Sequence, residues 1–370
     1  MRKMTFDVFV VGGGPAGLAA AISAAQQGLR VAVADCAQPP IDKACGEGLM
    51  PDSLQALSEL GITLEGCDTG VFRGIRFIGR QSFAQAEFPR GLGLGIRRTR
   101  LHELMVERAG GLGVDFFWGA RVSKTGDGRV EVDGARVDCR WMVGADGQNS
   151  SVRAWAGLAA GQEYERRLGL RQHFAIPPWS EFVEIYWGED CQAYITPIAR
   201  EEVCVAVISR RRPASFDHAL AQFPELWARL QKAPRSTAVK GSLTVTRRLR
   251  SVVRDNVILL GEASGSADAI TGEGLAVSFR QAKALGHALA AGDLSLYSGA
   301  HRKITALPEM LGRSMLLMDK YAWLRVRALR AFDRRPKLFH RLLAVHVGEV
   351  RPAEFGIRGI LNLGWGLLTA

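Results

Sequence analysis

An apolar run opens the chain between Val8 and Leu29, and it contains no charged side chain. The run is interrupted by Gly-Gly-Gly-Pro, which would break a membrane-spanning helix but suits a tight turn after a buried strand. The pattern therefore predicts a strand, a turn and an Ala-rich helix rather than a membrane span. A second apolar strand follows and ends at Asp35.

The following segment alternates short apolar and polar stretches between glycines, which predicts strands and a few amphipathic helices. We expect helices at 52–60 and 101–109, strands at 72–78, 82–88, 114–118 and 120–123, and a hairpin across Asp133-Gly134 that joins 129–132 to 135–139.

The alternation changes character after residue 164. It predicts a mostly antiparallel sheet, with strands at 171–176, 182–187, 192–198, 203–209 and 242–250 and one helical piece at 216–231. A buried strand then ends at Gly261-Glu262, and a Gly-rich loop leads into a helix to about Ala291. Helices are expected from 295 to 347.

The glycines of the first turn are spaced Gly12-x-Gly14-x-x-Gly17, with Pro15 and Ala16 between the last two. In this spacing the first glycine permits the turn, the second lets a phosphate approach the backbone, and the third lets helix and strand pack closely. The helix N-terminus offers free N–H groups to an anion, and Asp35 lies where a ribose-binding carboxylate is expected. The pattern predicts a dinucleotide site and leaves NAD(P) and FAD open.

Composition narrows the choice of partners. The formal net charge of +11 favours phosphate-bearing cofactors or anionic membrane lipids, whereas no recognised motif accompanies it to indicate nucleic acid. The six cysteines are widely spaced and include no Cys-x-x-Cys pair. We therefore predict no metal site, no disulfide scaffold and a reducing, cytoplasmic location.

Three stretches in this order resemble the motifs of the p-hydroxybenzoate hydroxylase and geranylgeranyl reductase superfamily of flavoproteins. The first is the glycine turn described above. The second is Asp146-Gly147-x-x-Ser150-x-Val152-Arg153, and the third is Gly261-Glu262 before the last Gly-rich loop. The resemblance covers roughly residues 5–300.

The resemblance implies an α/β fold with three parts. These are a Rossmann-like FAD-binding domain (1–70, 98–160 and 251–295), an inserted, mostly antiparallel β-sheet domain for substrate (71–97 and 161–250) and a C-terminal helical region (296–370). It implies FAD in an extended form, with the flavin ring near 271–274. The implied cofactor-binding residues are Gly12, Gly14, Pro15, Ala16, Gly17, Asp35, Gly46, Arg98, Val122, Asp146, Gly147, Gly261, Glu262, Gly272, Gly274 and Leu275.

Two features depart from the family pattern. Glu262 replaces the usual Asp, so its carboxylate must reach the ribityl chain of FAD differently. The geranylgeranyl reductase branch usually carries Tyr-x-Trp-x-Phe-Pro along its isoprenoid channel, whereas this chain reads Gln192-Ala-Tyr194-Ile-Thr196-Pro197 and keeps only the proline.

Flavin supplies the redox chemistry in this superfamily, and NAD(P)H is expected as a transient reductant. We expect a monooxygenase that hydroxylates an aromatic or lipophilic small molecule, because the prenyl-channel motif is eroded. One alternative is an ene-reductase that saturates double bonds of a prenyl or other lipophilic substrate. A further alternative is a flavin-binding protein without catalytic activity.

Three residues are candidates for catalysis. Cys45, in the loop Cys45-Gly-Glu-Gly, is expected to approach the flavin, with an inert buried thiol as the alternative. His173 could act as a base or hydrogen-bond partner of a phenol, and Tyr194 could contact substrate. For both of these, a purely structural role is the alternative.

The C-terminal region combines basic and apolar residues between Trp323 and Arg335, and an apolar tail runs from 355 to 368. This pattern indicates peripheral contact with an anionic membrane or a lipophilic, carrier-bound substrate. The alternative is a solvated basic face on a helix whose other side packs on the core of the protein.

Overall fold

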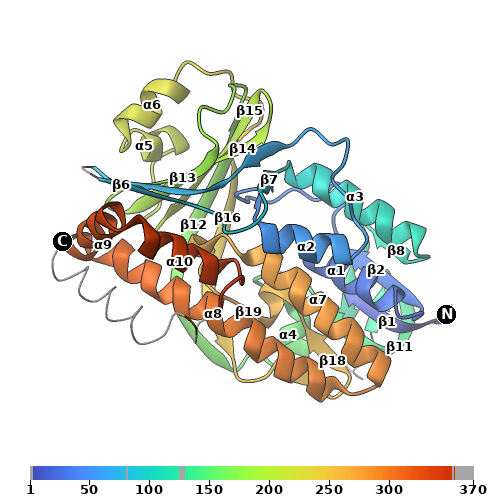
Figure 1. Cartoon of the computed structure of the whole chain (residues 1–370). Helices are drawn as coiled ribbons and strands as arrows, with labels where there is room; N and C mark the ends of the chain where they lie inside the picture. Colours follow the sequence, from blue (N-terminus) through green and yellow to red (C-terminus); the bar gives the residue numbers. More distant parts are fainter. Residues whose placement is uncertain (1–2, 81, 125–129, 352–353, 355–370) are drawn as a thin grey trace.

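A computed structural model describes residues 3–80, 82–124, 130–351 and 354 of the 370-residue chain. The apolar tail and Arg129 of the expected hairpin lie outside the described residues. The described chain forms two large sheets and one small sheet. Helices cover the outer faces, and α8 (Leu294–Lys320) passes from one large sheet to the other (Figure 1).

The first sheet is parallel at its centre because its apolar strands are buried on both faces. β1 (Lys3–Val11) pairs in parallel with β2 (Val31–Asp35) and β11 (Ala135–Gly144). β8 (Asp115–Trp118) extends the sheet beyond β2, and β18 (Val257–Leu259) extends it beyond β11. The antiparallel additions are β9 (Val122–Lys124), β10 (Val130–Val132) and β17 (Val253–Arg254). The expected hairpin is confirmed, because β10 pairs antiparallel with the first residues of β11. Its second strand is longer than expected, since β11 continues to Gly144.

Small side chains let two helices approach each other closely over this sheet. α1 (Pro15–Ala25) packs between α7 (Gly274–Ala291) and α3 (Arg98–Gly111). A Cβ atom on Gly286 would lie 2.3 Å from the Oγ atom of Ser23, so the helices touch at this glycine. α2 (Pro51–Glu59) packs on α7, and α4 (Ser151–Trp155) packs on β11.

The second sheet is antiparallel except between β5 and β13, which confirms the mostly antiparallel character expected from the sequence. Its strands are β5 (Gly74–Ile78), β6 (Phe83–Glu87), β12 (Gly161–Phe174), β13 (Phe182–Trp187), β14 (Cys191–Ala199), β15 (Glu202–Ser209), β16 (Lys240–Leu249) and β19 (Gly265–Ser266). A small sheet of β3 (Gly48–Leu49), β7 (Gly93–Gly95) and β4 (Gly70–Phe72) packs against β14 of the second sheet. The expected strand 72–78 is therefore divided between two sheets.

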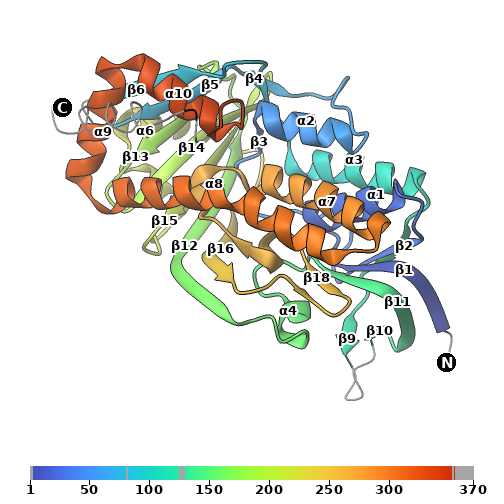
Figure 2. The ribbon, with the colours of Figure 1, turned by 60° about the horizontal axis from the view of Figure 1, so that its bottom comes forward.

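Helices cover both faces of the second sheet. α5 (Phe216–Leu220) and α6 (Pro224–Leu230) pack on one face, where they contact alternate residues of β15 such as Val205. α9 (Ala322–Arg334) and α10 (Pro336–His346) cover the other face beside β6 (Figures 1 and 2). The single helix expected at 216–231 is two, because a residue before proline avoids the helical region and Phe223 precedes Pro224 with ψ of 81°.

None of the helices in the described ranges combines the length and hydropathy needed to cross a membrane.

Candidate functional site

A cavity of about 1540 Å³ lies between the first sheet and the second, and both contribute to its walls. Nearly every residue expected to bind the cofactor lines it, although these residues come from distant parts of the sequence. The lining residues are Gly12, Gly14, Pro15, Ala16, Asp35, Gly46, Arg98, Val122, Asp146, Gly147, Gly261, Glu262, Gly272, Gly274 and Leu275. Gly17 is the exception.

The geometry of the three glycines explains why Gly12 and Gly14 line the cavity and Gly17 does not. Gly12 has φ of +108°, and a Cβ atom there would lie 2.4 Å from the carbonyl oxygen of Ala145. A Cβ atom on Gly17 would lie 1.8 Å from the oxygen of Gly12, so Gly17 lets α1 approach the turn. A Cβ atom on Gly14 would meet no atom within 4 Å, and no described side chain caps α1. The helix N–H groups therefore face open space that suits an anion.

Two carboxylates mark the ends of strands at the same edge of the first sheet. Asp35 ends β2 and accepts hydrogen bonds from the backbone N–H groups of Gly13 (2.7 Å) and Ala37 (2.8 Å). Asp146 follows β11, and its Oδ2 accepts from the N–H groups of Ser151 (2.7 Å) and Val152 (3.1 Å). Its Oδ1 is buried and has no hydrogen-bond partner among the described residues. The described chain thus leaves one acceptor of Asp146 unsatisfied.

Hydrogen bonds from Arg153 join the second motif to the third. The guanidinium group of Arg153 donates to the backbone oxygens of Ala263 (3.1 Å) and Gln148 (2.6 Å). Ala263 belongs to the short 3₁₀ helix η1 (Gly261–Ser264). The arginine of the second motif therefore holds the Gly261-Glu262 turn in place.

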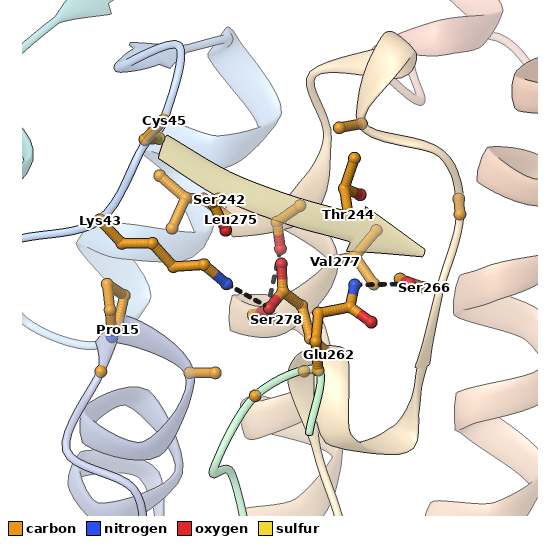
Figure 3. Close-up of a pocket in the computed structure, with 18 of the residues that line it drawn as sticks. Pro15, Lys43, Cys45, Ser242, Thr244, Glu262, Ser266, Leu275, Val277 and Ser278 are labelled. Atoms are coloured by element: carbon orange, nitrogen blue, oxygen red, sulfur yellow. Dashed lines mark hydrogen bonds and ion pairs between the residues drawn. The ribbon is translucent and has the colours of Figure 1, made fainter. Parts of the chain in front are cut away.

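Glu262 is paired with a lysine that the sequence analysis did not select. The Nζ atom of Lys43 lies 2.6 Å from Oε2 of Glu262, and the two side chains reach toward each other from opposite walls of the cavity (Figure 3). The partners are 219 positions apart, so no local pattern could reveal the pair. The one available signal was the position of Lys43 in the loop that carries Cys45.

The second sheet gives the cavity an apolar wall. Its residues alternate along their strands so that one set faces inward, and this set includes Ile75, Val183, Ile185, Ala206 and Ile208. Tyr194 is also in this wall, and its hydroxyl donates to the backbone oxygen of Ile270 (3.0 Å) in η2 (Ala269–Thr271). Burial raises the pKa of Tyr194, so the phenol stays protonated and anchors the Gly-rich loop.

The three candidate catalytic residues occupy different positions. Cys45 and Tyr194 line the cavity, whereas His173 does not. His173 is buried behind the Cys45 loop, where its Nε2 atom lies 2.6 Å from Oε2 of Glu47. A direct contact of His173 with substrate remains a prediction.

A second buried group of charges lies below the Gly-rich loop, where α2, α7 and α10 meet. Glu273 precedes α7, and its carboxylate lies 3.8 Å from Arg280 and 3.6 Å from His346. Burial raises the pKa of Glu273 to about 8 and that of Asp52 above its ordinary value. Burial also lowers the pKa of His346 to about 4. Neither carboxylate has a hydrogen-bond partner within the described chain.

The open space at Gly14, the unpaired Oδ1 of Asp146 and the free amides of α1 fit a dinucleotide that crosses the cavity. Together with the two-sheet fold, they define a flavin-dependent enzyme of the dinucleotide-binding class. Residues 5–293 match the family described as FAD binding domain, and the chain belongs to this family. The protein is an FAD-dependent oxidoreductase.

The curated relatives include both reductases and monooxygenases. The chain is 28% identical over 325 residues to menaquinone reductase of Mycolicibacterium smegmatis, which covers 80% of this chain and 78% of that protein. It is 28% identical to digeranylgeranylglycerophospholipid reductase 1 of Methanopyrus kandleri, covering 74% and 77%. It is 29% identical to 6-methylpretetramide 4-monooxygenase of Streptomyces rimosus, covering 41% and 30%.

The fold is shared with solved flavoproteins. A flavoprotein/dehydrogenase from Cytophaga hutchinsonii superposes with a TM-score of 0.82 over 99% of both chains, at 16% sequence identity.

Proposed function

We propose that the protein is a flavin-dependent reductase that saturates a carbon–carbon double bond of a prenyl or other lipophilic substrate. The supporting observation is the share of the chain that each kind of relative matches. The two reductases match about three quarters or more of both chains, whereas the monooxygenase from Streptomyces rimosus matches 41% of this chain. This preference reverses the order expected from the sequence motifs alone.

The cavity suits such a substrate. Its sheet wall presents aliphatic side chains, among them Ile75, Val183 and Ile185, which would bind an apolar chain and exclude water. Tyr194 holds the Gly-rich loop against this wall. Both features support a binding site for a lipophilic group next to the segment expected to carry the flavin ring.

Bound FAD would supply hydride chemistry, with NAD(P)H as the transient reductant. The described residues that line the cavity would hold FAD through the amides of α1, the carboxylates of Asp35 and Asp146, and the Lys43–Glu262 pair.

Anaerobic turnover tests this proposal. FAD-loaded protein should oxidise NAD(P)H without oxygen when menaquinone or digeranylgeranylglycerophospholipid is present. After any quinol has been reoxidised in air, mass spectrometry should still find a product with two more hydrogen atoms, because a saturated carbon–carbon bond is not reoxidised. A product that appears only with oxygen and gains an oxygen atom would refute the reductase and establish the second candidate.

That second candidate is a monooxygenase of an aromatic or lipophilic compound, and one observation favours it. Gln192 takes the place of an aromatic residue in the prenyl-channel pattern. It is fully buried, and it bonds to Arg167 and Asp319. A polar network therefore stands where the family channel is aromatic.

We further propose peripheral contact with an anionic membrane through the α8–α9 corner, in line with a lipophilic substrate. The exposed side chains there are Leu317, Tyr321, Trp323 and Val326, and Lys320 and Arg327 lie next to the aromatic rings. Trp, Tyr and basic residues together are typical of a surface that lies at a membrane interface.

A further inference from the structure

Side-chain contacts attach the loop from Asp42 to Gly48 to the second sheet. Asp42 pairs with Arg171 of β12, and the carboxylate of Glu47 bonds to His173 two residues further along that strand. The backbone oxygen of Cys45 accepts from the thiol of Cys204 (3.5 Å), which lies on β15 directly opposite His173. The attachment joins two segments that are more than a hundred residues apart in sequence.

Glu47 is held in an unusual backbone conformation. Three non-glycine residues of the described chain have positive φ, and Glu47, with φ of 59°, is the buried one of the three. Such a conformation costs free energy and persists only where the surroundings enforce it. Here the carboxylate accepts from the N–H group of Arg98 (3.0 Å), and the backbone oxygen accepts from Ile96 (3.1 Å).

The hydrogen-bonding partners define the protonation of His173. Guanidinium nitrogens can only donate, and those of Arg97 and Arg171 lie 2.8 Å and 3.1 Å from Nδ1 of His173. Nδ1 must therefore accept, and the proton is on Nε2, which donates to Glu47. Arg97 is in turn held by both carboxylate oxygens of Glu202.

The side chains of Glu47, His173 and Cys204 are also close enough together to hold a metal ion. However, two guanidinium groups already contact the same imidazole ring, and both ring nitrogens have hydrogen-bond partners. Burial raises the pKa of Cys204, so its thiol stays protonated and donates. The arrangement suits a hydrogen-bonded network better than a cation.

The consequence of this network is the position of Cys45. The N–H group of Glu47 points at the Cys45 sulfur at 3.4 Å, and Cys45 lines the cavity. We propose that Glu47 and His173 are positioning residues, which hold the Cys45 loop against the second sheet and thereby place the Cys45 thiol in the wall of the FAD cavity.

Alkylation of individual cysteines tests the proposal. Iodoacetamide is applied to folded protein with and without FAD, and the rate at Cys45 is measured by peptide mass spectrometry relative to half-buried Cys67, which does not line the cavity, in the same sample. Glu47→Ala and His173→Ala should release the loop and change the relative rate at Cys45 about tenfold or more. His173→Gln keeps a donor and an acceptor, so it should restore part of the wild-type rate.

A matched control separates positioning from general loss of stability. Leu226→Ala removes a buried side chain of α6 on the other face of the same sheet, so it should lower the melting temperature and leave the relative rate at Cys45 unchanged. The proposal is overturned if Cys45 reacts at the wild-type rate in both alanine variants, or if Leu226→Ala changes it equally. It is also overturned if zinc raises the melting temperature of the wild type and not of His173→Ala, which would assign a metal site instead. Because no substrate is needed, this test can fail independently of the proposed reaction.

Discussion

The glycines of the first turn differ in what an added Cβ atom would meet. At Gly17 a side chain would collide with the backbone of Gly12, whereas at Gly14 it would enter empty space in the cavity. The same substitution should therefore act on folding at one position and on the cofactor at the other.

Gly17→Ala should destabilise the apoprotein by about 1–3 kcal/mol, because the backbone must move to admit the methyl group. Gly14→Ala should leave the melting temperature of the apoprotein nearly unchanged and weaken FAD binding, since the methyl group fills the space expected for a phosphate. Thermal unfolding of both apoproteins and FAD titration check this contrast. Equal effects of the two variants on apoprotein stability would contradict it.

Local sequence patterns identified much of the site at this scale. The glycine spacing, Asp35 and Asp146-Gly147 are recognisable because each depends on neighbours within a few residues or on a regular strand–helix unit. Lys43 and Glu47 were not selected, because their partners Glu262 and His173 come from remote segments. No pattern along the chain indicates which remote side chains will meet.

At the scale of elements, the junction of α2, α7 and α10 brings together the titratable groups of Asp52, Arg280 and His346 around buried Glu273. The folded pKa of Glu273, about 8, exceeds the ordinary value of 4.5. The folded protein therefore binds more protons than the unfolded chain between these values. Ionised Glu273 lowers stability progressively as pH rises through this range, and the full cost is present above it.

Glu273→Gln should therefore raise the free energy of unfolding at about pH 9 by about 1–3 kcal/mol relative to wild type, and the melting temperature should rise with it. At about pH 5 the effect should be much smaller. His346 titrates in the opposite direction, so the comparison is made between variants at each pH. The control is Glu59→Gln. Glu59 is an exposed residue of α2 that pairs with Lys283 of α7, so the effect of its substitution should depend little on pH. A Glu273→Gln effect that is the same at both pH values would disprove the assignment.

The ends of helices and strands were predictable where hydrophobic residues recur at a regular spacing. They were less predictable where tertiary contacts decide where a strand begins or ends. The strands from 182 to 209 follow their expected positions closely, because alternate residues face two different cores. The segment 72–78 divides at Arg73, and at Gly74, which begins β5, a Cβ atom would lie 2.0 Å from the oxygen of Ala86. That close contact between strands has no signature in the local sequence.

For the whole molecule, the formal net charge is +11, and the exposed α8–α9 corner contributes Lys320 and Arg327 next to its aromatic rings. Part of α9 behaves as a packing helix, since Ala328, Leu329 and Phe332 are buried against the rest of the protein. The opposite side exposes Trp323, whose side chain is 62% exposed.

The protein should bind vesicles that contain anionic lipid and dissociate as salt is raised, because the attraction is partly electrostatic. Trp323→Ala and Arg327→Gln should each weaken this binding and leave the melting temperature close to wild type. Co-sedimentation with anionic and neutral vesicles measures the effect. Phe83→Ala, an exposed aromatic residue on β6, is the control. Equal binding to neutral vesicles, or no effect of either substitution, would contradict the contact.

The alternation along β13 has a practical use. Val183 and Ile185 face the cavity, while the neighbouring Tyr186 packs on Phe223 of α6. Randomising the inward positions on β5, β13 and β15 would therefore reshape the substrate wall without altering the opposite core or the glycine turn. The proposed substrate wall and the glycine turn therefore belong to different sheets, which makes the second sheet a suitable target for directed evolution.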